Sequence, residues 1–207
     1  MVDYAKAIKR PFTDFGKLVI GILLSILPIV SFIASGYALE CAKTASKKKY
    51  ELPKWENILG LFVKGVLIFV IGLIYFIPAI IFMLTGGIGI ASSLVSGEAT
   101  NLGRLFFTSG PLMIVSFFLF LIGIYLLPIA IVNYGTKNKF GKAFELKAVF
   151  EKVFSGKYAL SWLVVMVYSM VITMIIGFIP FVGGAIGSFV SAVTGFTIFG
   201  AVYSETK

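Results

Sequence analysis

The sequence predicts an all-α polytopic membrane protein, a transmembrane helical bundle of about five spans. Hydrophobic residues make up 59% of the 207 residues and charged residues only 13%. Soluble domains contain about 45–50% apolar and about 25% charged residues. Crossing a bilayer takes about 20 mostly apolar residues. Four uncharged stretches meet that length, and they cover residues 18–39, 65–97, 105–136 and 158–204.

The last stretch must fold back on itself. As one straight helix it would be about 70 Å long, but the hydrocarbon core is only about 30 Å thick. Pro180 and the following Phe181-Val182-Gly183-Gly184 provide the turn. The predicted spans are therefore about 18–42, 63–84, 111–134, 158–179 and 184–203.

An internal duplication is predicted from the prolines Pro28, Pro78, Pro128 and Pro180. Each follows Leu or Ile in an apolar segment, at intervals of 50, 50 and 52 residues. Proline removes a backbone hydrogen bond and bends its helix, so all four are candidate helix breaks, as in repeat-built transporters. The alternative is that they only shape helix packing. The predicted organisation is a basic arm (1–17), repeat unit one (18–84), a linker (85–110), repeat unit two (111–179) and a closing span with a short tail (180–207).

Each repeat unit also contains a predicted amphipathic helix, at 53–63 and at 140–155. Apolar residues fall at helical spacing on one face and charged residues on the other, which is typical of helices lying in the membrane surface. They are expected either to pack the bundle or to form a docking surface. The interfacial faces comprise Trp55, Ile58, Leu59, Phe62, Leu146, Val149, Phe150 and Val153.

The net charge of +9 is concentrated in two lysine-rich loops, one after the first predicted span and one after the third. Short lysine-rich loops remain cytoplasmic, so these loops and the C-terminus are expected on the cytoplasmic side of the plasma membrane. Lysines near the surface attract anionic lipid at about 1 kcal/mol each. The candidate headgroup contacts are Lys47, Lys48, Lys49, Lys142, Lys147 and Lys152.

The N-terminal arm conflicts with this topology, because five spans place it outside although it contains Lys6, Lys9, Arg10 and Lys17. Two interpretations are open. In the favoured one, 18–42 is a plain span and the loop lysines outweigh the arm. In the other, 18–42 is a re-entrant hairpin bent at Pro28, which keeps the arm inside.

Composition argues against catalysis. The chain has no histidine and one cysteine, so a Ser–His pair and a His-based metal site are excluded, and we expect no catalytic, metal or cofactor site. Nor does an aromatic-interleaved basic module or zinc site accompany the lysines, so nucleic acid is not an expected partner. Ion-coupled pumps usually carry buried charges, but the nearest candidates are Glu40 and Lys64 at span ends, which we expect to pair.

These observations predict a non-enzymatic membrane protein that binds lipid or a protein partner through its basic face, with self-association as a further possibility. The alternative is a small transporter or channel-like protein that uses the proline-broken helices.

Several motifs resemble the prokaryotic, mostly archaeal membrane family known as domain of unknown function 4013. They are Pro11-Phe12, Pro28-Ile29-Val30, Gly36-Tyr37-Ala38-Leu39, Leu52-Pro53-Lys54-Trp55 and Tyr75-Phe76-Ile77-Pro78. The resemblance implies an archaeal plasma-membrane protein. It implies no activity and no functional residues.

Overall fold

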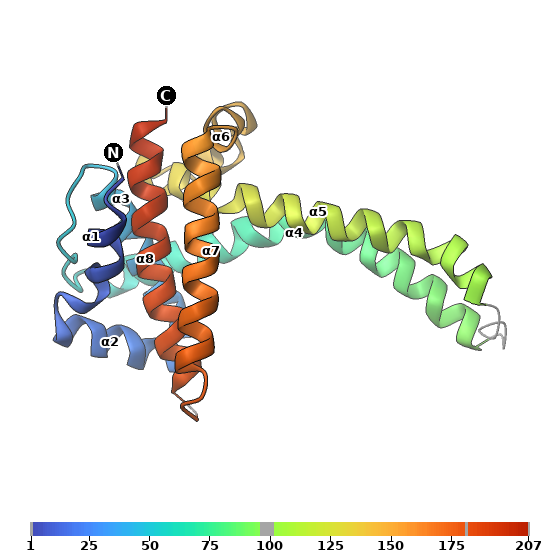
Figure 1. The fold of residues 1–207 in the computed structure, drawn as a ribbon, viewed down its shortest axis with the longest axis horizontal. Helices are drawn as coiled ribbons and strands as arrows, with labels where there is room; N and C mark the ends of the chain where they lie inside the picture. Colours follow the sequence, from blue (N-terminus) through green and yellow to red (C-terminus); the bar gives the residue numbers. More distant parts are fainter. Residues whose placement is uncertain (1, 96–101, 181, 207) are drawn as a thin grey trace. The chain divides into compact units, whose positions relative to one another are not determined.

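The computed structural model describes residues 2–95, 102–180 and 182–206, with side chains left out at 102–106 and 108. The described residues are almost all helical and include no strand (Figure 1). In chain order the elements are α1 (Tyr4–Lys9), η1 (Arg10–Phe12), α2 (Phe15–Ile26), α3 (Ser31–Ala45), α4 (Ile58–Val95), α5 (Leu102–Lys137), η3 (Phe140–Phe144), α6 (Leu146–Val153), α7 (Gly156–Ile176) and α8 (Gly183–Glu205).

The predicted fold class, a helical membrane protein, is confirmed. Among the described residues, four helices are long and apolar enough to cross a membrane: α4, the Ser109–Lys137 part of α5, α7 and α8. They contain or closely match four of the five predicted spans. The remaining apolar helix, α2, has only 12 residues, which is about 18 Å at about 1.5 Å per residue.

The chain divides into two compact units, residues 1–70 with 128–207, and residues 71–127. The second unit is an antiparallel helical hairpin made by the later part of α4 and the earlier part of α5. The rings of Phe76 and Phe120 lie 4.8 Å apart, and Ser116 Oγ donates a hydrogen bond to Ala79 O at 2.8 Å.

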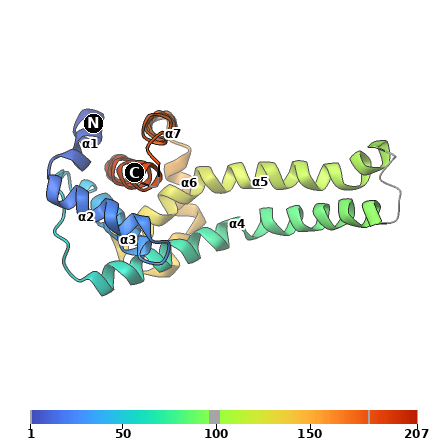
Figure 2. The same ribbon diagram turned by 90° about the horizontal axis from the view of Figure 1, so that it is seen from below.

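In the first unit, α8 is the central helix and packs on α3 and α7. Figure 2 shows it end on, beside α7 and near α1 and α3. Glycines allow the helix backbones to touch, as is typical of membrane helix packing. A Cβ on Gly36 would lie 2.0 Å from the Leu61 carbonyl oxygen, and one on Gly200 would lie 2.1 Å from that of Ala42. The contacts place α3 antiparallel to the start of α4 and parallel to α8.

The prediction of one continuous span over 18–42 is wrong. The chain leaves the helix at Leu27, which is extended (φ −95°, ψ 124°), because the residue before a proline is driven away from the helical conformation. A turn over 28–30 follows, and α3 begins at Ser31, whose amide donates to Leu27 O at 2.8 Å. Two shorter helices replace the expected span.

The arm does not lie on the opposite side from the first lysine-rich loop, as the favoured topology required. Lys17 Nζ donates to Leu52 O at 3.1 Å and Arg10 Nη2 donates to Glu51 O at 2.7 Å. Tyr4 and Ser161 share a hydrogen bond of 2.8 Å near the start of α7. The arm therefore packs beside the first lysine-rich loop, as the re-entrant interpretation requires.

The predicted surface helix over 53–63 is also wrong. Residues 52–57 are irregular, and the helix that follows is the first part of α4. The Asn57 side chain accepts a hydrogen bond from the Gly60 amide at 3.0 Å and starts that helix. Trp55, predicted to lie on the surface face of a helix over 53–63, instead stacks on Tyr37 in the core, with ring centroids 3.8 Å apart. In the second loop, η3 and α6 occupy the range predicted for a single helix.

The four prolines lie in three different settings. Pro28 is in the turn between α2 and α3, Pro78 and Pro128 lie inside the continuous helices α4 and α5, and Pro180 follows the end of α7. The predicted helix breaks at Pro78 and Pro128 are therefore absent. The linker predicted at 85–110 is largely helical, and its residues 96–101 lie outside the described part, as does Phe181 of the predicted turn. The internal duplication stays a prediction.

Candidate functional site

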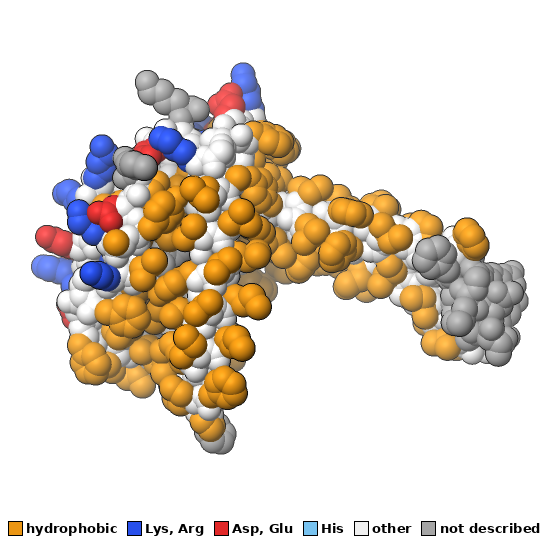
Figure 3. All heavy atoms as spheres, viewed as in Figure 1, with side chains coloured by type: hydrophobic (Ala, Val, Ile, Leu, Met, Phe, Trp, Pro, Cys, Tyr) orange, Lys and Arg blue, Asp and Glu red, His pale blue; other side chains and the backbone are white. Residues whose placement is uncertain are grey.

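Lysine side chains of the first unit gather at the end that contains both chain termini (Figure 3). Lys43 Nζ of α3 donates to Asn138 Oδ1 at 3.3 Å, which joins the two lysine-rich loops. Lys152 Nζ of α6 donates to Tyr203 O at 3.0 Å, which adds the end of α8. Segments that are far apart in sequence thus form one basic surface, which we call the lysine-rich end.

A cleft of about 960 Å³ opens in this surface between the N-terminal arm and the loop at 49–54. We call it the arm cleft. Its lining includes two carboxylates, Asp14 and Glu51. Five lysines also line it: Lys6, Lys9, Lys17, Lys49 and Lys54. Five cations against two anions leave an excess of three positive charges, so the arm cleft is suited to an anion.

Two of the five lysines have no ion pair within the described chain. Lys17 pairs with Asp14 at 3.1 Å, Lys6 with Asp3 at 3.1 Å and Lys54 with Glu56 at 3.6 Å. Lys9 and Lys49 are not part of any described ion pair. The Asp14 carboxylate accepts a hydrogen bond from the Lys17 backbone amide, which lowers the pKa of Asp14. Asp14 therefore stays charged, and it is one of the two anions already counted against the five lysines.

Arg10 lies directly behind the arm cleft and is fully buried. Its guanidinium donates four hydrogen bonds: from Nη1 to Cys41 O (2.8 Å) and Thr197 Oγ1 (3.0 Å), and from Nη2 to Thr44 Oγ1 (2.6 Å) and Glu51 O (2.7 Å). Thr44 and Glu51 also line the cleft. The guanidinium thereby joins the arm, the end of α3, α8 and the loop.

No acceptor of Arg10 is a carboxylate. All four are neutral oxygens, and its Nε is buried without a hydrogen-bond partner among the described residues. Burial lowers the pKa of Arg10, but arginine remains protonated in proteins. A buried cation is normally paired with an anion. Because Arg10 has no such anion among the described residues, it adds an uncompensated positive charge behind the cleft.

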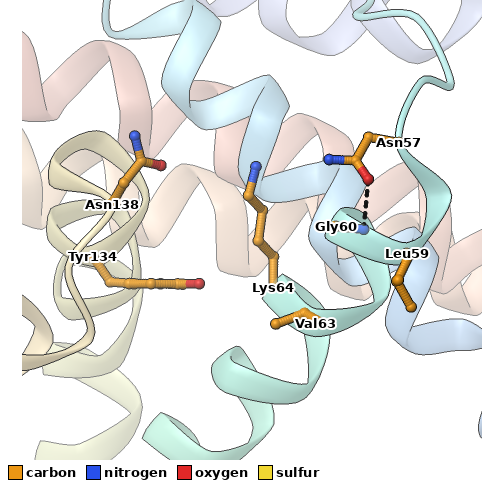
Figure 4. Close-up of a pocket in the computed structure, with 7 residues that line it drawn as sticks. All are labelled: Asn57, Leu59, Gly60, Val63, Lys64, Tyr134 and Asn138. Atoms are coloured by element: carbon orange, nitrogen blue, oxygen red, sulfur yellow. Dashed lines mark hydrogen bonds between the residues drawn. The ribbon is translucent and has the colours of Figure 1, made fainter.

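A second pocket, of about 420 Å³, lies between the start of α4 and the end of α5 (Figure 4). Lys64 extends into it between Tyr134 and Asn57. Its Nζ forms an ion pair with Glu40 Oε1 of α3, as the sequence predicts. Because that pair is neutral overall, this pocket attracts an anion less strongly than the arm cleft.

The six lysines predicted to contact headgroups are dispersed over the lysine-rich end. Only Lys49 lines the arm cleft. Lys142 forms an ion pair with Glu145, which lowers the pKa of that carboxyl, and Lys152 lies 4.3 Å above the Tyr203 ring. The others, Lys47, Lys48 and Lys147, are exposed.

The predicted interfacial faces also divide. On α6, Val149 and Val153 are buried, whereas Leu146 and Phe150 are 52% and 38% exposed. Ile58 and Leu59 are exposed at the start of α4, and Phe62 contacts the Phe32 ring edge-on at 6.0 Å. The structure does not bring the eight residues together into a single face.

The sequence prediction missed the contribution of the N-terminal arm, which supplies three of the five cleft lysines. The signal was present, since four basic residues within 17 positions favour the lysine-rich side of a membrane. Arg10 stood among them without any local feature to mark it as buried.

Long apolar helices and a charged end define the chain as a polytopic helical membrane protein. The family described as "Protein of unknown function (DUF4013)" matches residues 19–181. The match covers well over half of the chain, so this protein belongs to the DUF4013 family. No curated protein and no solved structure matches the chain. No group of three or more His, Cys, Asp or Glu side chains that could hold a metal occurs among the described residues.

Proposed function

We propose that this protein binds anionic phospholipids at one membrane surface through its lysine-rich end, without catalysing a reaction. The observation that carries the proposal is the arm cleft, in which five lysines outnumber two carboxylates above a buried arginine. Each surface lysine contributes about 1 kcal/mol to attraction by anionic lipid. In this proposal the lysine-rich end faces the cytoplasm, in line with the positive-inside rule.

The structure favours lipid binding over transport through proline-broken helices. Such a site requires interrupted helices that line a cavity. Pro78 and Pro128 lie within continuous helices, and none of the four prolines lines the clefts described above. A protein partner on the same basic surface would need acidic side chains and is an alternative outcome of the test below.

The test uses the purified full chain in nanodiscs of equal phosphatidylglycerol and phosphatidylcholine, released into the gas phase for native mass spectrometry. We expect retained phosphatidylglycerol to exceed phosphatidylcholine by about tenfold, which corresponds to about 1.4 kcal/mol. The preference should fall as salt rises, because screening weakens exposed charges. Equal retention of the two lipids at low salt would overturn the proposal, and co-purification of an acidic protein in their place would favour the partner alternative.

A further inference from the structure

Three cations without a carboxylate partner belong to the arm cleft. Lys9 and Lys49, which lack ion pairs in the described chain, line it from the arm and from the loop. Arg10 lies behind the lining, with Nε unpartnered among the described residues and hydrogen bonds to the lining residues Thr44 and Glu51. Phosphate oxygens form strong charge-assisted hydrogen bonds with such cations.

Exposed apolar side chains begin where the cleft ends. Phe12 precedes the lining residues Thr13 and Asp14 and is 55% exposed, and Phe15 follows them and is 77% exposed. Val19 and Leu23, also exposed, continue from Phe15 at intervals of four residues along one face of α2. Side chains four residues apart lie on the same side of a helix, so an apolar strip leads away from the cleft.

A polar anion site with an apolar strip at its edge fits a lipid and not a soluble phosphate. The strip would lie against the acyl chains while the cleft holds the headgroup. Acyl chains in a bilayer already lie in hydrocarbon, so the selectivity comes from the headgroup contacts and the strip only keeps the chains beside the cleft. A soluble phosphate compound would make no use of the apolar side chains Phe15, Val19 and Leu23 beside the cleft.

From this juxtaposition we infer that the arm cleft is a specific site for the phosphate of one anionic phospholipid, with its acyl chains along the exposed face of α2. The inference rests on the proposed function and narrows it from a basic surface to a single cleft. Lys9 and Lys49 hold the phosphate oxygens, and buried Arg10 supplies a fixed positive charge behind them. Lys54 adds an exposed cation to the lining, although Glu56 lies 3.6 Å away.

Two charge-matched variants test the site. The cleft variant is Lys9→Gln/Lys49→Gln/Lys54→Gln, and the control is Lys47→Gln/Lys139→Gln/Lys147→Gln. Both remove three exposed lysines, but only the first set lines the arm cleft. Phosphatidylglycerol affinity is measured by native mass spectrometry of the full chain. We expect the cleft variant to lose at least about tenfold, or about 1.4 kcal/mol, and the control less than about threefold.

Equal losses in both variants would overturn the inference while leaving the proposed function standing, whereas a wild type without any phosphatidylglycerol preference would overturn both. If the triple cleft variant fails to fold, Lys9→Gln and Lys49→Gln are measured singly, and each must lose more affinity than Lys47→Gln. Competition by inorganic phosphate and glycerol 1-phosphate separates the sources. Displacement of the lipid by either at the concentration of the lipid itself would refute a lipid ligand.

Discussion

Replacing Arg10 with methionine tests whether this buried cation holds the arm, α3, α8 and the loop together. The substitution keeps most of the side-chain volume but removes all four hydrogen bonds. Glu51 O accepts no other hydrogen bond in the described chain, so it loses its only partner, whereas Thr44 and Thr197 keep bonds within their own helices.

The expected loss of stability is about 2–4 kcal/mol. Losing four hydrogen bonds to a charged group, at about 1.5–3 kcal/mol each, would cost about 6–12 kcal/mol. Removing the buried charge recovers its desolvation penalty of several kcal/mol, which offsets most of that loss. For a chain of this size each kcal/mol shifts Tm by about 2–4 °C, so thermal unfolding in detergent should show Tm lowered by about 5–15 °C.

Two further measurements make this result specific. Lys9→Met removes an exposed neighbouring cation and should leave Tm within about 2 °C. In a Trp162→Phe background the emission of Trp55 should shift to the red in the Arg10→Met protein, because the loop that holds its ring against Tyr37 loosens. An Arg10→Met protein that melts with the wild type and keeps its Trp55 emission would show that Arg10 does not hold these four segments together.

Three more outcomes are expected from thermal or acid unfolding. Gly36→Ala should lower the free energy of unfolding by about 2–3 kcal/mol, because the added Cβ would overlap the α4 backbone. Gly184→Ala, where the added Cβ meets no atom within 4 Å, should raise it by about 0.5–1 kcal/mol. Equal effects of the two substitutions would contradict the close packing of α3 on α4. A backbone hydrogen bond lowers the pKa of Asp14, so the stability that its charge contributes is complete above about pH 4 and is lost as pH falls through the lowered value. Asp14→Asn should therefore lose less stability than the wild type on acidification. Parallel plots of stability against pH for the two proteins would count against this. Lys48 has φ of 59°, a conformation that costs a side chain about 1–2 kcal/mol, so Lys48→Gly should raise Tm, and a lower Tm would argue against that conformation.

Hydropathy predicts four of the spans because an uninterrupted apolar stretch has few other solutions in a bilayer. The same signal cannot distinguish one span over 18–42 from two shorter helices, since residues 18–39 contain no charged residue on either side of Pro28. The difference depends on tertiary contacts, such as the approach of Phe189 to Gly21 and of Leu61 to Gly36. Pro28 was the only local sign of the break.

Trp55 shows a second limit of sequence patterns. Its spacing to Ile58, Leu59 and Phe62 fits a helix face, but in the structure the ring stacks on Tyr37 and packs against the core. Tyr37 provides that core position, and its hydroxyl donates to Pro53 O at 2.9 Å, which fixes the extended loop. Arg10 is similar, because its burial depends on acceptors from three distant segments.

Cysteine labelling in sealed vesicles tests whether the arm and the lysine-rich loops lie together on one side of the membrane. The labelling uses a Cys41→Ala background, which removes the single, buried thiol. We expect Lys6→Cys and Lys47→Cys to react with a membrane-impermeant maleimide from the same side, and Gly184→Cys, at the other end of α8, from the opposite side. Reaction of Lys6→Cys from the side that labels Gly184→Cys would contradict the shared surface.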